Sequence, residues 1–76
     1  ASFEQQQFWM VFEACLNHLP PKTARVFMMR EFLGLDTGEI CKETGISSSN
    51  CWVVLHRARM GLRTCLETRW FAGAGA

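Results

Sequence analysis

The sequence predicts an all-α domain built from four helices. Hydrophobic residues recur at steps of three and four along most of the chain, which is the period of an amphipathic helix. No segment alternates with the two-residue period of a strand, and Val53–Val54 is the one strand-like β-branched pair. Prolines, glycines and capping residues divide the helical pattern into segments. We therefore expect one helical domain at residues 1–71, followed by a flexible tail at residues 72–76.

The first helix is expected to begin beside Ser2 and to end near His18. Ser2 is followed three residues later by Gln5, which is the spacing of a capping box. Pro20 and Pro21 stop this helix, and Pro21 suits the first position of the next one because its missing N–H needs no partner there. The apolar stripe of the first helix consists of Phe8, Phe12, Cys15, Leu16 and Leu19.

Two shorter helices are expected next. The first covers residues 22–33 and ends at Gly34, which can adopt the left-handed conformation of a helix terminus. Asp36 and Glu39 form a second capping-box pattern, which opens a helix at residues 37–44. The apolar residues of these two helices are Val26, Phe27, Met29, Phe32, Leu33, Ile40 and Cys41.

The last helix is preceded by a tight turn in which Gly45 ends the third helix and Ile46 is buried. Ser47 or Ser48 caps the last helix, which is expected to continue to about Phe71. A short helix, a three-residue turn and a capped helix have the spacing of a helix-turn-helix, although many helical hairpins share it. The inward stripe of the last helix is Cys51, Leu55, Ala58, Leu62 and either Cys65 or Leu66.

Composition excludes several classes of protein. A chain of 76 residues with 49% hydrophobic and 20% charged residues is one globular domain and not a disordered segment. Its apolar runs are far shorter than the roughly 20 residues of a membrane span, so we expect no membrane association. The net charge of +1 is too small for binding nucleic acid by bulk electrostatics alone. The basic residues nevertheless gather toward the end of the chain, at Arg57, Arg59, Arg63 and Arg69.

The four cysteines would suit two disulfides in a secreted protein. No pair has C-x-x-C spacing, and the cysteines fall at helical positions, so we interpret all four as reduced, buried core residues. A metal or redox role is the alternative. The chain opens with ASFEQQQ and shows no leader segment, which we interpret as a piece of a longer cytoplasmic protein. The cysteines are Cys15, Cys41, Cys51 and Cys65.

No catalytic constellation is evident. Glu39, Glu43 and His56 could serve as acid and base, but no nucleophile, oxyanion site or phosphate-binding loop accompanies them. Neither His18 nor His56 belongs to a close pair of metal ligands. We therefore expect no enzymatic activity, no cofactor and no metal. Six phenylalanines and three tryptophans are many for four short helices, so we expect some of them to be exposed to a partner.

Two stretches, LPPKTARVFMMREFLGLDTGEICKETGIS and LHRARMGLR, resemble region 4 of bacterial sigma factors of the extracytoplasmic-function group in the sigma-70 family. The resemblance covers about residues 19–66, and the preceding helix fits the first helix of that region. Four motifs in the expected order carry it, namely Leu19-Pro20-Pro21, Glu39-Ile40, Gly45-Ile46-Ser47 and Leu55-His56-Arg57-Ala58-Arg59.

The resemblance implies a four-helix domain of the winged-helix-like DNA-binding superfamily, with a C-terminal helix-turn-helix and no wing. It implies that the last helix binds the minus-35 promoter element and that the domain docks on the β flap of the RNA polymerase core. An anti-sigma factor is a further partner that it implies. By the same resemblance, the residues that contact DNA are Lys42, Ser47, Ser48, Ser49, Asn50, Trp52, Val53, His56, Arg57 and Arg59.

Three residues depart from the family pattern, which often has a basic residue, a serine and an arginine at Trp52, Val53 and Val54. Trp52 and Val53 could pack on thymine methyl groups, Trp52 could bind a protein partner, or its ring could fold back over the core. Val54 has no expected role. The arginines could also form a simple solvated face. The alternative function is accordingly a helical protein-interaction module with little independent DNA binding, which salt-dependent binding would distinguish.

Overall fold

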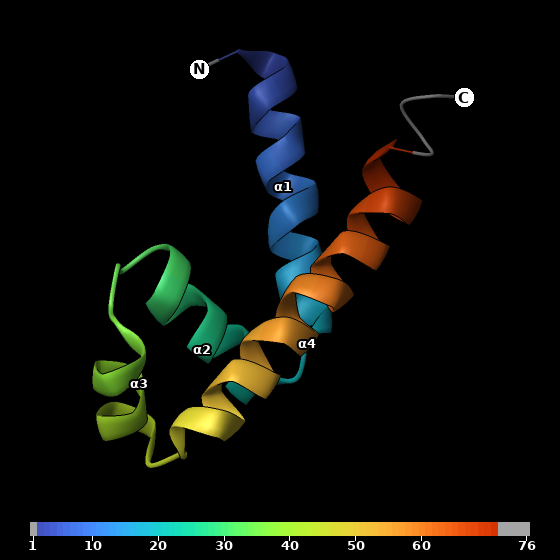
Figure 1. Ribbon diagram of the computed structural model, residues 1–76. Helices are drawn as coiled ribbons and strands as arrows, with labels where there is room; N and C mark the ends of the chain where they lie inside the picture. The colour runs from blue at the N-terminus through green and yellow to red at the C-terminus, as the bar shows by residue number, and fades with distance from the viewer. Residues whose placement is uncertain (1, 72–76) are drawn as a thin grey trace.

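The computed structural model describes residues 2–71, and these form an all-α domain with no strand in the part described, which confirms the predicted fold class. Ala1 and the predicted tail at residues 72–76 lie outside the described residues. The N-terminal end of α1 and the C-terminal end of α4 lie at the same end of the molecule, and α3 lies at the opposite end (Figure 1). The elements are α1 (Phe3–His18), α2 (Pro21–Glu31), α3 (Thr37–Thr44), α4 (Ser48–Leu66) and one π-helical turn, η1 (Glu67–Phe71).

Both predicted capping boxes are present. The Ser2 hydroxyl accepts a hydrogen bond from the Gln5 N–H at 3.1 Å, and the Ser2 N–H donates to Gln5 Oε1. At α3, the Asp36 carboxylate accepts from the Glu39 N–H at 2.8 Å, and the Asp36 N–H donates to Glu39 Oε1. These local patterns fix the starts of α1 and α3 because each satisfies N–H groups that have no partner within the helix.

α2 ends at Glu31, two residues before the predicted end. The backbone remains helical in conformation at Phe32, and the Leu33 N–H donates to the Met28 carbonyl at 3.1 Å, which closes a wider turn. Gly34 follows with a φ of 71°, as expected of a left-handed stop. Phe32 and Leu33 are 50% and 68% exposed, so this end of α2 presents apolar side chains to solvent.

Two hydrophobic clusters form the core, and α4 takes part in both. The first joins α2, α3 and the N-terminal half of α4, and the second joins α1, α2 and the C-terminal half of α4. The predicted inward stripe of α4 is confirmed, because its first four residues are buried and Cys65 and Leu66 pack against the second cluster. Val54, for which the sequence suggested no role, packs against the first cluster.

The prediction that all four cysteines are reduced is wrong for one pair, because Cys15 and Cys65 form a disulfide across 50 residues of sequence. α1 runs antiparallel to the end of α4 and brings these two positions to the same level, with their Cα atoms 5.7 Å apart (Figure 1). Sequence spacing within one helix carries no information about this register between helices. Cys41 and Cys51 are free and lie in or against the first cluster, as predicted.

Candidate nucleic-acid interface

The turn between α3 and α4 has the geometry of a helix-turn-helix. Gly45 adopts a φ of 75°, and its N–H donates to the Cys41 carbonyl at 2.8 Å to close α3. A residue with a Cβ is strained in this conformation, which explains the glycine. Ile46 is 8% exposed and inserts into the first cluster, so the turn is fixed to the core. The direction of α4 relative to α3 is therefore determined by two adjacent residues.

Ser47 is the N-cap of α4, which decides between the two serines proposed from the sequence. Its hydroxyl accepts a hydrogen bond from the Asn50 N–H at 3.1 Å. Ser48, Ser49 and Asn50 are exposed, so hydroxyl and amide groups surround the first turn of α4. Since the first N–H groups of a helix lack partners within it, this end of α4 offers hydrogen-bond donors to an anion such as phosphate.

The outer face of α4, defined as Ser49, Trp52, Val53 and His56, lies opposite its buried stripe, and all four residues are exposed. Trp52 is 53% exposed and Val53 is 44% exposed. The alternative in which the Trp52 ring folds back over the core is therefore wrong. This face combines polar groups with two apolar side chains, which is the composition expected of a surface that contacts a partner.

The arginines of α4 differ in what they contact. Within residues 2–71, Arg57 is exposed and makes no ion pair or side-chain hydrogen bond. Arg59 Nη2 lies 2.9 Å from Glu31 Oε1 of α2, and Arg63 Nε lies 2.9 Å from Glu67 Oε1. Arg59 and Arg63 thus have acidic partners inside the domain. The sequence did not indicate the partner of Arg59, because Glu31 lies on another helix.

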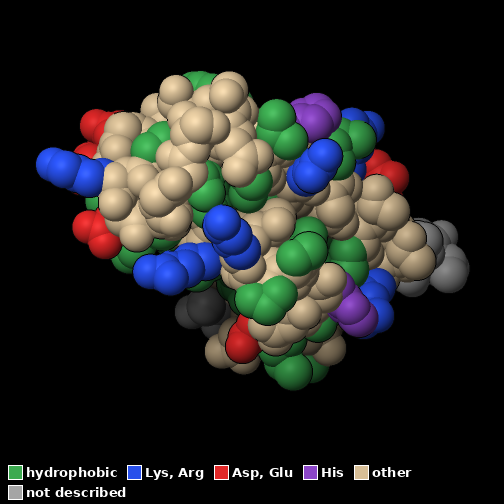
Figure 2. All heavy atoms as spheres, turned by 90° about the horizontal axis from the view of Figure 1, so that it is seen from below, with side chains coloured by type: hydrophobic (Ala, Val, Ile, Leu, Met, Phe, Trp, Pro, Cys, Tyr) green, Lys and Arg blue, Asp and Glu red, His purple; other side chains and the backbone are tan. Residues whose placement is uncertain are grey.

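Lys42 is exposed on α3 and lines a hollow between α2 and α3 together with Arg25 and Glu43. Seen from below, the molecule shows Lys and Arg side chains interspersed with hydrophobic ones, without a continuous basic surface (Figure 2). This distribution agrees with a net charge of only +1. A net charge this small gives the domain only a weak overall electrostatic attraction to a polyanion.

One thiol within the helix-turn-helix has a perturbed pKa. Burial raises the pKa of the Cys51 thiol, and the neighbouring Cys41 raises it further, while Arg30 acts in the opposite direction. Cys51 is completely buried where α4 packs on α3. It therefore stays protonated at neutral pH and acts as a core residue, not as a nucleophile.

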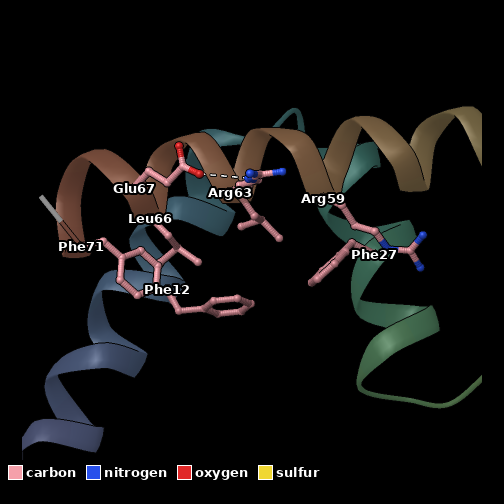
Figure 3. A pocket seen from close by; sticks show the side chains of 8 residues that line it. Phe12, Phe27, Arg59, Arg63, Leu66, Glu67 and Phe71 are labelled. Carbon is pink, nitrogen blue, oxygen red and sulfur yellow. Dashed lines mark hydrogen bonds and ion pairs between the residues drawn. The ribbon is translucent and has the colours of Figure 1, made fainter.

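An apolar pocket of 590 Å³ lies on the other side of α4, between α1, α2 and η1. Phe12 of α1 and Phe27 of α2 point toward one another below α4, with their ring centroids 6.4 Å apart (Figure 3). Arg63, Glu67 and Phe71 border this pocket from α4 and η1. A second hollow of 570 Å³ between α1 and α2 shares Phe12 and adds Trp9 and Phe32.

The sequence indicated that some aromatic residues would remain exposed, but it did not place them. Three of the exposed aromatic residues, Trp9, Phe32 and Phe71, line these two hollows, whereas the exposed Phe3 and Trp52 line neither. Trp9 is 52% exposed, and Phe71 is 58% exposed. We call the surface made by Trp9, Phe12, Phe27, Phe32 and Phe71 the aromatic groove.

Neither metal ligation nor a membrane span is found in the described chain. Among residues 2–71, no group of three His, Cys, Asp or Glu side chains comes close enough together to hold a metal ion. No helix within this range has both the length and the apolar character needed to cross a membrane.

Comparison with known proteins places the helix-turn-helix in a family. The family model described as sigma-70, region 4 matches residues 9–62, which run from within α1 to near the last turn of α4 and include the turn between α3 and α4. The chain belongs to the sigma-70 region 4 family. This confirms the resemblance at the level of the family and gives the chain its coarse role as a DNA-binding domain of a sigma factor, a class of transcription regulators that are not enzymes.

A curated relative of this sigma-70 region 4 domain is a probable RNA polymerase sigma factor of Haemophilus influenzae. The two are 54% identical over 63 residues, which is 83% of this chain. The matched segment is only 32% of the relative, so the chain spans about a third of the length of that protein. No solved structure matches the chain.

Proposed function

We propose that this sigma-70 region 4 domain recognises the minus-35 promoter element with α4 and thereby directs transcription initiation by RNA polymerase. The observation that carries the proposal is a helix-turn-helix of the matching family whose second helix has an uncovered outer face. On the motifs quoted above, we assign the full protein to the extracytoplasmic-function group and place it in the cytoplasm, where its DNA and polymerase are found.

In this proposal α4 enters the major groove with its N-terminus first. Ser47, Ser48 and Asn50 lie around the helix N-terminus and contact the DNA backbone there. The outer face, Ser49, Trp52, Val53 and His56, meets the base edges. Contacts to phosphates determine the register of the helix on the duplex, and contacts to base edges determine the sequence it prefers.

The cations contribute unequally. Arg57 has no acidic partner within residues 2–71 and is available to a phosphate, and Lys42 of α3 contacts the backbone beside the turn. Arg59 already pairs with Glu31. To contact a phosphate, its guanidinium must either break this ion pair or bind the carboxylate and the phosphate together. We assign Arg57 the larger share of the nonspecific affinity for this reason.

We assign the aromatic groove to the RNA polymerase core, at the β flap. The groove is lined by the inner side of α4 together with α1 and α2, whereas the proposed DNA surface is the outer face of α4. The two proposed surfaces lie on different sides of α4 and share Arg59 at their border, so both partners can be held at the same time. Simultaneous binding raises the effective affinity for DNA beyond what a domain of net charge +1 achieves alone.

An anti-sigma factor is the second proposed class of partner. The support is the apolar character of both surfaces, since Trp9 and Trp52 are each about half exposed and exposed tryptophans are frequent centres of protein interfaces. A protein that covers both surfaces would block promoter DNA and polymerase together. A helical protein-interaction module without DNA binding remains the competing function for the Trp52 surface.

The test is selection of DNA sites by the full-length factor assembled with RNA polymerase core, with the wild-type protein and a Trp52→Ala variant in parallel. The proposal expects an enriched sequence at the minus-35 position and a changed preference in the variant. Polymerase binding without any enriched sequence at that position would favour the protein-interaction module.

A further inference from the structure

The outer face of α4 has an apolar centre. Trp52 and Val53 are adjacent, 53% and 44% exposed, and lie within the first two turns of the helix. The ring of Trp52 forms none of the aromatic pairs among the described residues, which instead join side chains of α1, α2 and η1. About half of each side chain is therefore free to contact a partner.

The chemistry of the two side chains limits what they can recognise in a major groove. A valine side chain has no hydrogen-bonding group, and an indole has a single N–H donor. Neither can make the bidentate hydrogen bonds by which Arg, Lys, Asn or Gln distinguish guanine and adenine. The apolar group that distinguishes base pairs in the major groove is the C5 methyl of thymine.

The position of the cations supports the same conclusion. Arg57 follows on the edge of the outer face, and Arg59 and Arg63 pair with Glu31 and Glu67. No Lys or Arg precedes Arg57 in α4, so the first two turns, which go deepest into the groove, carry no cation. Recognition there depends on polar caps and on the apolar pair.

The fold restricts the positions of Trp52 and Val53 before any partner binds. They belong to a helix fixed by Cys51 and Leu55, which are completely buried on the opposite side. Valine has little freedom at χ1 in a helix, so little conformational entropy is lost when it makes a contact. Consecutive helix residues point about 100° apart, so Trp52 and Val53 reach different base pairs.

We propose that Trp52 and Val53 make this domain selective for thymine, by packing on the C5 methyl groups of one or two base pairs of its DNA site. The proposal rests on the proposed function, in which α4 lies in the major groove. It adds the class of base recognised and the two residues that recognise it.

The experiment replaces each thymine of the selected minus-35 site by uracil, one at a time, and measures binding by the full-length factor with polymerase core. Uracil lacks only the methyl group and keeps every hydrogen-bonding group. The expected result is a loss of about fourfold at one or two positions, which is the effect of one buried carbon. At the same positions, 5-methylcytosine binds about fourfold better than cytosine, because the methyl group is restored.

The variants Trp52→Ala and Val53→Ser each remove the uracil effect at one position while polymerase binding, which uses another surface, shows that the protein is folded. Met60→Ala is the matched control, because Met60 is also exposed on α4, at 46%, but lies beyond the first two turns. Its uracil effect stays as in the wild type.

The outcomes separate the two proposals. Specific DNA binding that is indifferent to uracil at every thymine overturns thymine selection and leaves the proposed function standing. Loss of the uracil effect in Met60→Ala as well overturns the assignment to Trp52 and Val53. Absence of any specific DNA binding by the assembled factor overturns both proposals.

Discussion

The Arg59 guanidinium lies 2.9 Å from the Glu31 carboxylate and joins the middle of α4 to the end of α2. Both side chains are nearly half exposed, so the pair adds little to stability, on the order of 0.5 kcal/mol. Its consequence is electrostatic. One of the arginines in the LHRAR motif is partly neutralised within the domain, and its neighbour Arg57 is not.

We predict that Arg57→Ala weakens DNA binding for all sequences alike and lowers the slope of log K against log salt by about one. Arg59→Ala has a smaller effect on both quantities, because Glu31 already compensates its charge. Salt titrations of the full-length factor on promoter and unrelated DNA measure both the affinity and the salt slope of each variant. Equal losses for the two variants would show that the Glu31 pair does not persist on DNA.

The disulfide predicts a redox-dependent stability. Breaking the Cys15–Cys65 bond with dithiothreitol, or by Cys15→Ser, lowers the midpoint of thermal unfolding, since a bridge across 50 residues contributes up to about 4 kcal/mol. Cys41→Ser serves as control because Cys41 is free. It keeps the sensitivity to dithiothreitol, whereas Cys15→Ser loses it. Four reactive thiols in denatured, unreduced protein would refute the bridge.

The cap of α4 predicts a defined loss of stability. Ser47→Ala removes the acceptor of the Asn50 N–H and lowers the free energy of unfolding by about 1 kcal/mol. Ser48→Ala is the control, because Ser48 lies inside the helix and its hydroxyl makes no hydrogen bond within the described residues. It stays within about 0.5 kcal/mol of the wild type. Urea unfolding compares the two, and similar losses would place the cap at Ser48.

Stability at alkaline pH follows from Cys51. Its pKa is raised in the folded protein, chiefly by burial, so the folded state keeps the proton that the unfolded state loses above about pH 8.5. The contribution of this thiol to stability is complete below that pH and is lost as pH rises toward the folded pKa. Urea unfolding from pH 7 to 10 should show a steeper decline for the wild type than for Cys51→Ala. Parallel curves would contradict the shift.

The domain alone is predicted to bind promoter DNA weakly. With a net charge of only +1 the domain releases few counterions, and polymerase supplies the remaining contacts in the assembled enzyme. Fluorescence anisotropy with labelled promoter DNA measures the affinity. A nanomolar dissociation constant at physiological salt would be incompatible with this account.

Local sequence signals predicted local structure well. Ser2, Asp36 and Ser47 cap their helices as their patterns indicated, and Gly45 ends α3 in the left-handed conformation. The buried stripe of α4 followed from its period, because one side of a helix recurs every three or four residues. Capping and periodicity involve residues within about one helical turn of each other, so both can be predicted from short stretches of sequence.

Relationships between distant residues were not predictable in the same way. The Cys15–Cys65 bond and the Arg59–Glu31 pair depend on how α1 and α2 lie against α4, over separations of 50 and 28 residues. The aromatic groove depends on the same arrangement. Val54 had no expected role, and its packing against the first core cluster likewise depends on where α2 and α3 lie against α4.

The central claim is that the outer face of α4 contacts promoter DNA. The most direct measurement places a photocrosslinking benzoylphenylalanine at position 52 in the full-length factor, assembled with polymerase core on promoter DNA, with the same group at Phe71 as a control from the aromatic groove. We predict crosslinks from position 52 to bases of the minus-35 element and from position 71 to polymerase. Crosslinks from position 52 to protein alone would contradict the account.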